Sequence, residues 1–130
     1  MYGLKTVYDD KSNKDTISQM LEYLAGKRKD FNLKTKFLAG TEFEKKVWSE
    51  LAKIPYGEVI SYKELADNSG SPKAYRAVGS ANSKNPLPII YPCHRVINSN
   101  GALGGYSGGL EIKKILLRVE SLIPRKLLPR

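Results

Sequence analysis

The sequence predicts an α+β fold, with a mainly helical domain over residues 41–130 that contains a helix-turn-helix and a short sheet, preceded by a short α/β segment over residues 1–40. Three observations lead to this expectation. Two capping boxes open helices early in the larger domain. Two short helices then follow one another across a glycine-containing turn. An apolar run, finally, ends at the only Cys-His pair of the chain.

The segment 1–40 has the pattern of a strand, a helix and a second strand. Residues 2–8 can form the first strand, and residues 9–14 read as a polar turn. A helix that ends near Gly26 follows from apolar residues at helical spacing, namely Ile17, Met20, Leu21 and Leu24. Alternating residues predict the second strand over 33–37. Such a unit is too small to be stable alone, so we expect it to pack on the following domain.

Two helix starts in the larger domain are marked by capping boxes. Thr41 with Glu44, and Ser61 with Glu64, have the spacing at which two orphan backbone donors are satisfied reciprocally. The first helix carries an apolar stripe with a tryptophan beside it, made of Phe43, Val47, Leu51, Ile54 and Trp48. Both helices are therefore expected to pack on the core through one face.

The helix-turn-helix is predicted from the turn 68–70 and from Ser71-Pro72, which have the residue types of a helix cap and first helical position. The second helix is expected over residues 73–81. Its surface is mostly small, with one long cation, Arg76, among Ala74, Ala77, Gly79 and Ala81. Small residues suit close approach to a narrow groove of DNA, with one side chain free to enter the base stack. An ordinary corner between two helices would have the same spacing.

The segment 89–96 contains the candidate reactive residues of the chain. It reads as a buried strand that stops at Pro92 and presents the thiol of Cys93 next to the imidazole of His94. Only the thiolate is a strong nucleophile, and a neighbouring imidazole can lower the pKa of a thiol. The alternative is a buried structural cysteine beside a surface histidine.

After this stretch, residues 98–109 form a long glycine-rich loop that lacks the pattern of a phosphate-binding loop. Either the loop lets backbone approach a ligand closely, or it is a flexible surface loop. A final amphipathic helix that ends near Glu120 follows from Ile112, Ile115, Leu116 and Val119. The tail from Ser121 is expected to be loosely attached.

Composition limits the possible classes. One cysteine excludes an internal disulfide, and one cysteine with one histidine excludes a Cys/His zinc cage within the chain. Without a membrane-span or signal-peptide pattern, and with a free thiol, a reducing compartment such as the cytoplasm is expected. The net charge of +9 is uneven, with +2 over residues 1–60 and +7 over residues 61–130. This favours a polyanionic partner such as nucleic acid, or else a lysine-rich solubilising surface.

Seven motifs occur together and in order: Ile54-Pro55-Tyr56-Gly57-Glu58, Ser61-Tyr62, Arg76-Ala77-Val78-Gly79, Asn85-Pro86, Pro92-Cys93-His94-Arg95-Val96, Gly104-Gly105-Tyr106 and Glu120. In this combination the chain resembles the methylated-DNA–protein-cysteine methyltransferases, the suicide proteins that repair O6-alkylguanine in DNA. The match covers roughly residues 40–120, and Pro-Cys-His-Arg-Val is a specific motif.

The resemblance implies a single-turnover methyltransferase without cofactor or metal. Cys93 would accept the alkyl group, and His94 would help form the thiolate through an ordered water. Glu120 would orient His94, and Tyr62 would donate a proton to N3 of the flipped guanine. A carboxylate beside an imidazole should favour the charged ring, which in turn favours the thiolate. The lack of a second, resolving thiol fits a protein that is used once.

The remaining implied residues bind the base and the DNA. Around the base and its alkyl group the resemblance places Val96, Ser107, Asn85, Pro88, Tyr106 and Gly108. On double-stranded DNA, approached by a monomer through the minor groove, it places Arg76, Ala74, Ala77, Gly79, Lys63, Ser71 and Ser99. Arg76 would fill the gap left by the extruded base, and Asn85 would brace the turn between the helix-turn-helix and the active site.

The chain departs from the family pattern in two places. The family usually carries a longer N-terminal domain, sometimes with zinc, so residues 1–40 read as a truncated version. Tyr75 is bulky in a helix of small residues, and either faces the core or alters how the helix sits in the groove. The rival functions are a non-catalytic lesion-binding protein of the alkyltransferase-like kind, a helix-turn-helix regulator and a cysteine hydrolase. The first of these would lack Cys93.

Overall fold

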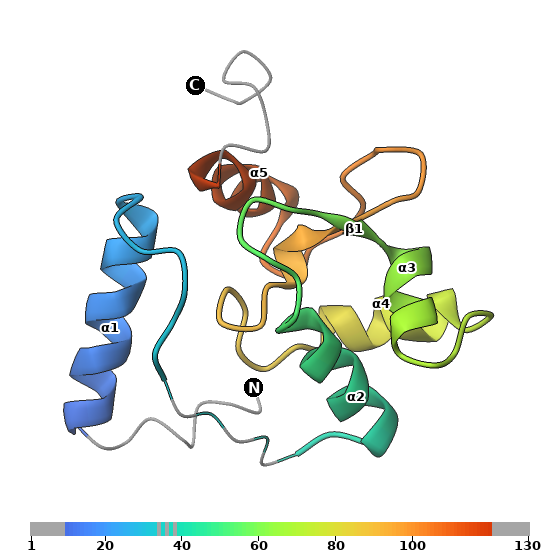
Figure 1. Cartoon of the computed structure of the whole chain (residues 1–130), viewed down its shortest axis with the longest axis horizontal. Coiled ribbons are helices and arrows are strands. Elements are labelled where there is room, and N and C mark those ends of the chain that lie inside the picture. The colour runs from blue at the N-terminus through green and yellow to red at the C-terminus, as the bar shows by residue number, and fades with distance from the viewer. Residues whose placement is uncertain (1–9, 34, 36, 38, 121–130) are drawn as a thin grey trace.

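Helices dominate the described part of the chain, and the sheet found there is small (Figure 1). The computed structural model describes residues 10–33, 35, 37 and 39–120. In chain order its elements are α1 Asp10–Leu24, α2 Glu42–Leu51, β1 Ile60–Ser61, α3 Tyr62–Asn68, α4 Tyr75–Ser83, the 3₁₀ helix η2 Cys93–Arg95, β2 Val96–Ile97 and α5 Leu110–Val119. The predicted α+β class is confirmed. Within the described residues, no helix has the length and apolar character that crossing a membrane requires.

Helix α2 begins with the capping box that the sequence predicts. The Thr41 side chain accepts from the Glu44 backbone N–H, while the Glu44 carboxylate accepts from the Thr41 N–H. The predicted apolar stripe is buried around Trp48, which is fully inaccessible to solvent. The indole N–H donates to the Ala81 carbonyl at 2.8 Å, and this contact fastens α2 to α4. Gly40, with φ of +112°, lets the chain pass close to the indole ring.

The helix-turn-helix is formed by α3 and α4, joined through a turn at Gly70 with φ of +79°. The capping box of Ser61 and Glu64 opens α3 as predicted. The predicted start of the second helix is wrong, because the chain first closes a turn in which the Ala74 N–H donates to the Ser71 carbonyl. Ala74 is the N-cap and has no side-chain cap hydrogen bond, and α4 continues to Ser83 rather than ending near residue 81.

The predicted strand over residues 89–96 is mostly absent. Residues 89–90 form a turn in which Ile89 has φ of +76°, and the 3₁₀ helix η2 follows. Of the predicted strand, only the last residue, Val96, belongs to β2. The prolines at 86, 88 and 92 lack a backbone N–H, so this segment could not complete a ladder of hydrogen bonds. The burial was predicted correctly, since Cys93 and Val96 lie in the core. An apolar run alone does not distinguish a strand from a buried turn.

The sheet is a parallel pair of two-residue strands. Ile60 lies opposite Val96, and Ser61 lies opposite Ile97. This register has a functional consequence, because Tyr62 follows β1 directly and η2 precedes β2 directly. The sheet therefore brings the first residue of α3 next to the segment that carries the Cys-His pair.

Helix α1 differs from its prediction in length and in orientation. It begins at Asp10, so residues 10–14 are helical where a turn was expected. Its buried residues are Gln19 and Tyr23, whereas Ile17, Leu21 and Leu24 are exposed. The Gln19 side chain holds the returning chain through both backbone groups of Asn32, at 3.1 and 2.8 Å. A polar and an aromatic side chain thus decide which face of α1 is buried.

The segment between α1 and α2 has no regular structure at Leu33, Thr35 and Phe37, so the strand expected there is absent. Phe37 instead packs against Trp48, with ring centroids 5.1 Å apart. The strand expected over residues 2–8 and the tail from Ser121 lie outside the described residues.

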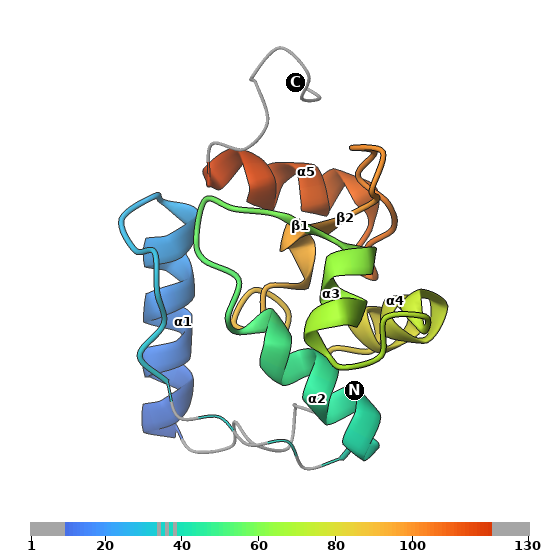
Figure 2. The ribbon, with the colours of Figure 1, turned by 45° about the vertical axis from the view of Figure 1, so that its right-hand side comes forward.

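Helix α5 ends where the sequence predicts, with Glu120 as its C-cap. Its buried residues are Lys113, Leu116 and Leu117, whereas the predicted face residues Ile112 and Ile115 are exposed. In both views α1 stands on one side of the molecule and the helix-turn-helix on the opposite side (Figures 1 and 2). The Cys-His segment lies between them, so it can be reached by side chains from both.

Candidate active site around Cys93

Cys93 is the first residue of η2 and is only 1% exposed. It lies at the wall of a cavity of about 380 Å³ between α3, α4 and the glycine-rich loop. The cavity is lined by Tyr62, Gly79, Asn82, Ser83, Cys93, Gly105, Tyr106 and Ser107. A thiol at the wall of a cavity has room for a substrate in front of it.

The environment of the thiol favours its protonated form. Burial raises the pKa of Cys93, although hydrogen bonds with Asn85 and Tyr106 and the positive charge of Lys113 act in the opposite direction. The thiolate is the nucleophilic form, so this site needs a base that can take the thiol proton.

His94 is fully buried, and its Nε2 lies 2.7 Å from Oε2 of Glu120, so these two side chains meet as the sequence analysis expected. The other ring nitrogen, Nδ1, is buried and has no hydrogen-bond partner among the described residues. Burial lowers the pKa of His94, and the hydrogen bond with Glu120, which raises it, does not outweigh burial. Glu120 thus favours the charged ring, as the sequence analysis expected, but desolvation of the ring dominates and the net shift of the pKa is downward.

A neutral imidazole in this position has a defined arrangement of protons. Nε2 faces a carboxylate, which only accepts, so Nε2 must carry the hydrogen. Nδ1 then has a free lone pair, and this makes His94 a proton acceptor.

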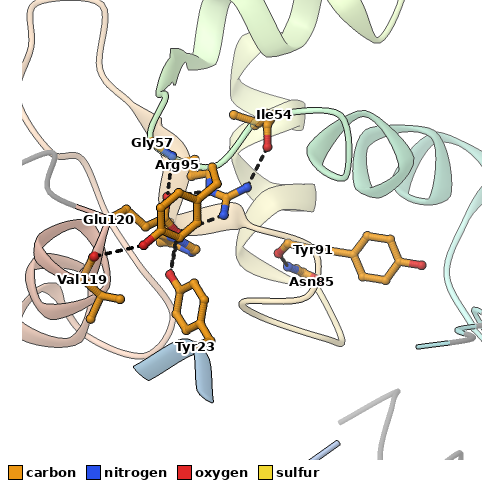
Figure 3. Close-up of polar contacts among 10 residues, drawn as sticks. Tyr23, Ile54, Gly57, Asn85, Tyr91, Arg95, Val119 and Glu120 are labelled. Atoms are coloured by element: carbon orange, nitrogen blue, oxygen red, sulfur yellow. Dashed lines mark hydrogen bonds and ion pairs between the residues drawn. The ribbon is translucent and has the colours of Figure 1, made fainter. Parts of the chain in front are cut away.

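The Glu120 carboxylate accepts hydrogen bonds from four residues in three parts of the chain (Figure 3). Arg95 donates through Nε to Oε1 at 2.8 Å and through NH2 to Oε2 at 3.0 Å. The Gly57 N–H donates to Oε1 at 3.2 Å. Burial raises the pKa of Glu120, but hydrogen bonds from His94, Arg95 and Tyr23 outweigh burial and hold that pKa at about 2. Glu120 is therefore a permanent negative charge behind the imidazole.

Two of these donors had no assigned role in the sequence analysis. Arg95 stands next to His94 in the Pro-Cys-His-Arg-Val motif, and it also donates to the Ile54 carbonyl at 2.7 Å. Its place in the motif was a signal that could have identified it. Tyr23 comes from α1, and its hydroxyl donates to Oε2 of Glu120 at 2.5 Å (Figure 3). Nothing in the helical spacing of that segment distinguished Tyr23 from a core residue.

Lys113 is a third residue that the sequence analysis missed. Its side chain is fully buried, and the ammonium group donates to the carbonyls of Val96 at 2.7 Å, of Gly105 at 3.1 Å and of Leu103. Burial lowers the pKa of Lys113 to about 8, against the attraction of Cys93. The glycine-rich loop is thus fastened to β2 by a buried cation, and its cavity-lining part is an ordered wall.

Tyr62 lies close to this anchor, with its ring centroid 6.0 Å from the Lys113 ammonium. Its hydroxyl donates to the Gly105 carbonyl at 3.4 Å, a long contact that a ligand could replace. Burial raises the pKa of Tyr62, so the phenol keeps its proton near neutral pH. Gly104, with φ of +71°, permits this approach, because a Cβ there would lie 3.0 Å from the Tyr62 ring.

A second hollow of about 600 Å³ adjoins the cavity and gathers most of the expected alkyl-pocket residues. It is lined by Ser83, Lys84, Asn85, Pro88, Ile89, Tyr106, Ser107, Gly108 and Ile112. Asn85 holds the backbone beside this hollow in place, because its Nδ2 donates to the Tyr91 carbonyl at 2.6 Å (Figure 3). Its Oδ1 accepts from the Leu87 N–H at 3.0 Å. Val96, by contrast, is fully buried and lines neither hollow.

A third hollow, of about 850 Å³, runs along the outer face of the helix-turn-helix. It is lined by Tyr62, Lys63, Pro72, Lys73, Tyr75, Arg76, Gly79, Asn98, Ser99 and Asn100. Tyr75 is 52% exposed, so it faces this hollow and not the core. Ala77 is exposed on α4 outside it, while Ala74 and Ser71 are half-buried in the turn before α4.

The comparisons with known proteins agree on one family. The family model described as "6-O-methylguanine DNA methyltransferase, DNA binding domain" matches residues 42–122. A methylated-DNA–protein-cysteine methyltransferase of Methanosarcina barkeri is 52% identical over 109 residues, which cover 82% of this chain and 67% of the relative. The constitutive enzyme of that name from Bacillus subtilis is 54% identical over 105 residues, covering 80% of this chain and 63% of the relative. The chain thus spans about two thirds of these relatives.

Solved structures are also similar. The Mycobacterium tuberculosis OGT in complex with DNA is 47% identical with a TM-score of 0.80, over 88% of this chain and 71% of that one. The Schizosaccharomyces pombe Atl1 in complex with damaged DNA containing O6-carboxymethylguanine is 37% identical with a TM-score of 0.55, over 64% of this chain and 79% of that one. With the family match, the identity to curated relatives and the geometry around Cys93 all in agreement, this chain belongs to the family of the methylated-DNA–protein-cysteine methyltransferases.

Proposed function

We propose that this protein repairs DNA by direct reversal, transferring an alkyl group, such as methyl, from O6 of guanine to Cys93 irreversibly and once per molecule. The observation that carries the proposal is the thiol of Cys93 at a cavity wall, next in the chain to an imidazole whose far side is held by a carboxylate. Membership of the family and the relatives' name support the same chemistry.

The reaction begins with the thiol proton. Nδ1 of His94 is the acceptor, and a water molecule between the two side chains would carry the proton across. The Glu120 charge stabilises the imidazolium that results. Cys93 then attacks the sp³ carbon of the alkyl group, for which a thiolate is the best nucleophile among side chains. The S–C bond forms, the C–O bond breaks, and the electron pair passes to the guanine.

The leaving guanine needs a proton, and in this proposal Tyr62 supplies it at N3. Its phenol is protonated and lines the same cavity as Cys93. The backbone of Cys93 and Val96 and the amide of Ser107 complete the base contacts in this proposal. Pro88, Tyr106 and Gly108 form the pocket for the alkyl group.

The DNA partner is double-stranded and is approached through its minor groove. An O6-alkyl group lies inside the stack, so the nucleotide must be flipped out at a cost of about a few kcal/mol. In this proposal Arg76, which is exposed on α4 at the hollow that Tyr62 shares with the reaction cavity, fills the gap. Ala74, Ala77 and Gly79 permit close packing of the helix-turn-helix on the groove. Lys63, Ser71 and Ser99 contact the DNA backbone, and the protein acts as a cytoplasmic monomer.

The similarity to Atl1 raises the alternative of a lesion-binding protein without chemistry. The position of Cys93 in the cavity favours transfer over binding alone. The chain holds no second thiol that could remove the alkyl group from Cys93, which favours a single turnover.

Intact-mass analysis tests the proposal. After incubation with an excess of duplex oligonucleotide that contains O6-methylguanine, the protein should gain the mass of one methyl group per molecule, with the modification located at Cys93. The Cys93→Ser variant should bind the same duplex and gain no mass. An unmodified wild-type protein, or one that converts many equivalents of oligonucleotide, contradicts the proposal.

A further inference from the structure

Tyr23 lies in the part of the chain that precedes the family match, which begins at residue 42. Its helix, α1, stands on the opposite side of the molecule from the helix-turn-helix (Figures 1 and 2). Nevertheless, the Tyr23 side chain is fully buried and reaches the polar cluster behind Cys93. The labelled Tyr23 and Glu120 side chains point at one another in Figure 3.

The Tyr23 hydroxyl contacts both Glu120 and His94, the two side chains that together form what we call the relay behind Cys93. It donates to Oε2 of Glu120 at 2.5 Å, and it lies 3.3 Å from Nε2 of His94. His94 Nε2 uses the same carboxylate oxygen at 2.7 Å. The phenol has one proton, and that proton is directed to Glu120. Tyr23 and His94 therefore share one acceptor oxygen.

Competition for one acceptor has a chemical consequence. Each donor that binds Oε2 reduces the negative charge that the oxygen offers to the other donors. A carboxylate with fewer donors would hold the imidazole proton more strongly and favour the imidazolium. An imidazolium has no lone pair on Nδ1 and takes no proton from a thiol.

We propose that Tyr23 is a positioning residue of the alkyl-transfer relay. By donating to the carboxylate oxygen that His94 also uses, Tyr23 weakens the attraction of that oxygen for the imidazole proton. The imidazole then stays available as the base. The N-terminal helix is then a working part of the catalytic apparatus. The role in transfer rests on the proposed function, whereas the effect of Tyr23 on His94 does not.

Other charged and titratable groups also face His94, and they must be held constant in any test. They are Cys93 and Arg95 on η2, Lys113 on α5 and Glu120 at its end. Tyr56, in the segment before β1, packs against Tyr23 itself. Burial and the hydrogen bond to Glu120 raise the pKa of Tyr23, so its phenol does not itself titrate near neutral pH. A titration near neutral pH that responds to the Tyr23 hydroxyl is therefore not that of the phenol itself.

Tyr23→Phe removes the hydroxyl and keeps the ring, which packs against Phe31 with centroids 5.6 Å apart and against Tyr56 at 6.2 Å. The matched control is Tyr56→Phe. Its hydroxyl donates to the Val119 carbonyl at 3.1 Å and to no atom of the relay. Both variants lose one phenol hydroxyl from the same aromatic cluster, so only a role in the relay separates them.

The first measurement is an NMR titration of the imidazole in the full-length protein without DNA. His94 is the only histidine, so its ring signals need no assignment. In Tyr23→Phe the pKa of His94 should rise by about half a unit to one unit, and in Tyr56→Phe it should stay at the wild-type value. Replacing Tyr23 by 3-fluorotyrosine strengthens the donor without changing the packing, and should move the pKa of His94 downward.

The second measurement is the rate of methyl transfer from the duplex oligonucleotide as a function of pH. The acid limb should move upward in Tyr23→Phe, so that transfer on that limb is about three- to tenfold slower, because half a unit to one unit of pKa changes the neutral fraction by that factor. The alkaline plateau should stay at or above that of the wild type. A merely structural role would lower the rate at every pH.

The outcomes separate the two proposals. If the pKa of His94 is the same in the wild type and both Tyr23 variants, the inference about Tyr23 is wrong, whatever the transfer rates are. If the Tyr23→Phe protein does not fold, the fluorotyrosine protein decides through the sign of its shift. If the wild type transfers no methyl group while the pKa of His94 responds to Tyr23, the proposed function fails and the contact between Tyr23 and His94 stands.

Discussion

At the scale of the residue, five hydrogen bonds from the described part of the chain converge on the Glu120 carboxylate. The folded protein holds the pKa of Glu120 at about 2, below its ordinary value of 4.5. A depressed carboxylate pKa contributes stability that is complete above the ordinary value and is lost as the pH falls towards the folded value. The free energy of unfolding should therefore decrease as the pH falls from about 5 to 2, by about 3 kcal/mol.

Glu120→Gln should remove this pH dependence. At neutral pH the substitution should also lower the free energy of unfolding by about 3–5 kcal/mol, because it leaves the buried Arg95 without its charge partner. The measurement is urea unfolding at a series of pH values. Glu111→Gln is the control, since it removes a carboxylate from the same helix whose side chain is 63% exposed. Equal pH dependence in both variants would contradict the assignment of the acid-labile stability to Glu120.

At the scale of the element, the approach of the chain to α2 depends on Gly40. Its φ is +112°, and a Cβ at this position would lie 2.6 Å from two atoms of the Trp48 ring. Gly101 has φ of +87° with nothing within 4 Å of a Cβ. Gly101→Ala should therefore cost about 1 kcal/mol for its backbone conformation alone.

Gly40→Ala should cost about 1–3 kcal/mol more than Gly101→Ala, because the fully buried indole cannot move without disturbing the core. Thermal or urea unfolding of the two variants measures the difference. Equal losses would mean that the close contact between Gly40 and Trp48 does not restrict the chain.

The elements differ in how far the sequence could predict them. Local hydrogen bonds decide the starts of α2 and α3, so the two capping boxes were visible in the residue types. The start of α4 depends on a turn that includes Ser71, and residue types alone did not reveal that turn. The faces of α1 and α5 were predicted wrongly because Tyr23 and Lys113 are buried by distant polar partners, which periodicity does not contain.

The same distinction holds for the candidate site. The contact between His94 and Glu120 was predicted because both residues belong to recognisable motifs. The lowering of the His94 pKa was not predicted, since it depends on the degree of burial of the ring. Tyr23 and Lys113 act through contacts between distant parts of the chain, and a single sequence gives no signal for these.

At the scale of the whole molecule, the net charge of +9 is concentrated in residues 61–130, which include the helix-turn-helix. DNA affinity should therefore fall steeply as salt rises, with little dependence on sequence, because most of the binding energy comes from phosphate contacts. Lys63→Ala, in the hollow along the helix-turn-helix, should reduce the salt slope by about 1.

Fluorescence anisotropy with several unrelated duplexes over a range of salt concentrations measures that slope. Lys53→Ala is the control, because Lys53 is an exposed cation just after α2 that pairs with Glu50. If Lys53→Ala reduces the slope as much as Lys63→Ala does, the helix-turn-helix is not the surface that meets the phosphates.

The hydrogen bond between Tyr23 and Glu120 joins residues 97 positions apart, and it has a consequence for the protein while it is being made. A contact of this separation needs both ends of the loop to be present, and closing the loop has an entropic cost. On the ribosome, Cys93 emerges before Glu120, and a growing chain that already has the thiol still lacks the carboxylate behind His94. The relay is completed only after the final helix has been synthesised and has docked. Until then, the thiol of a nascent chain has no imidazole backed by a carboxylate to take its proton.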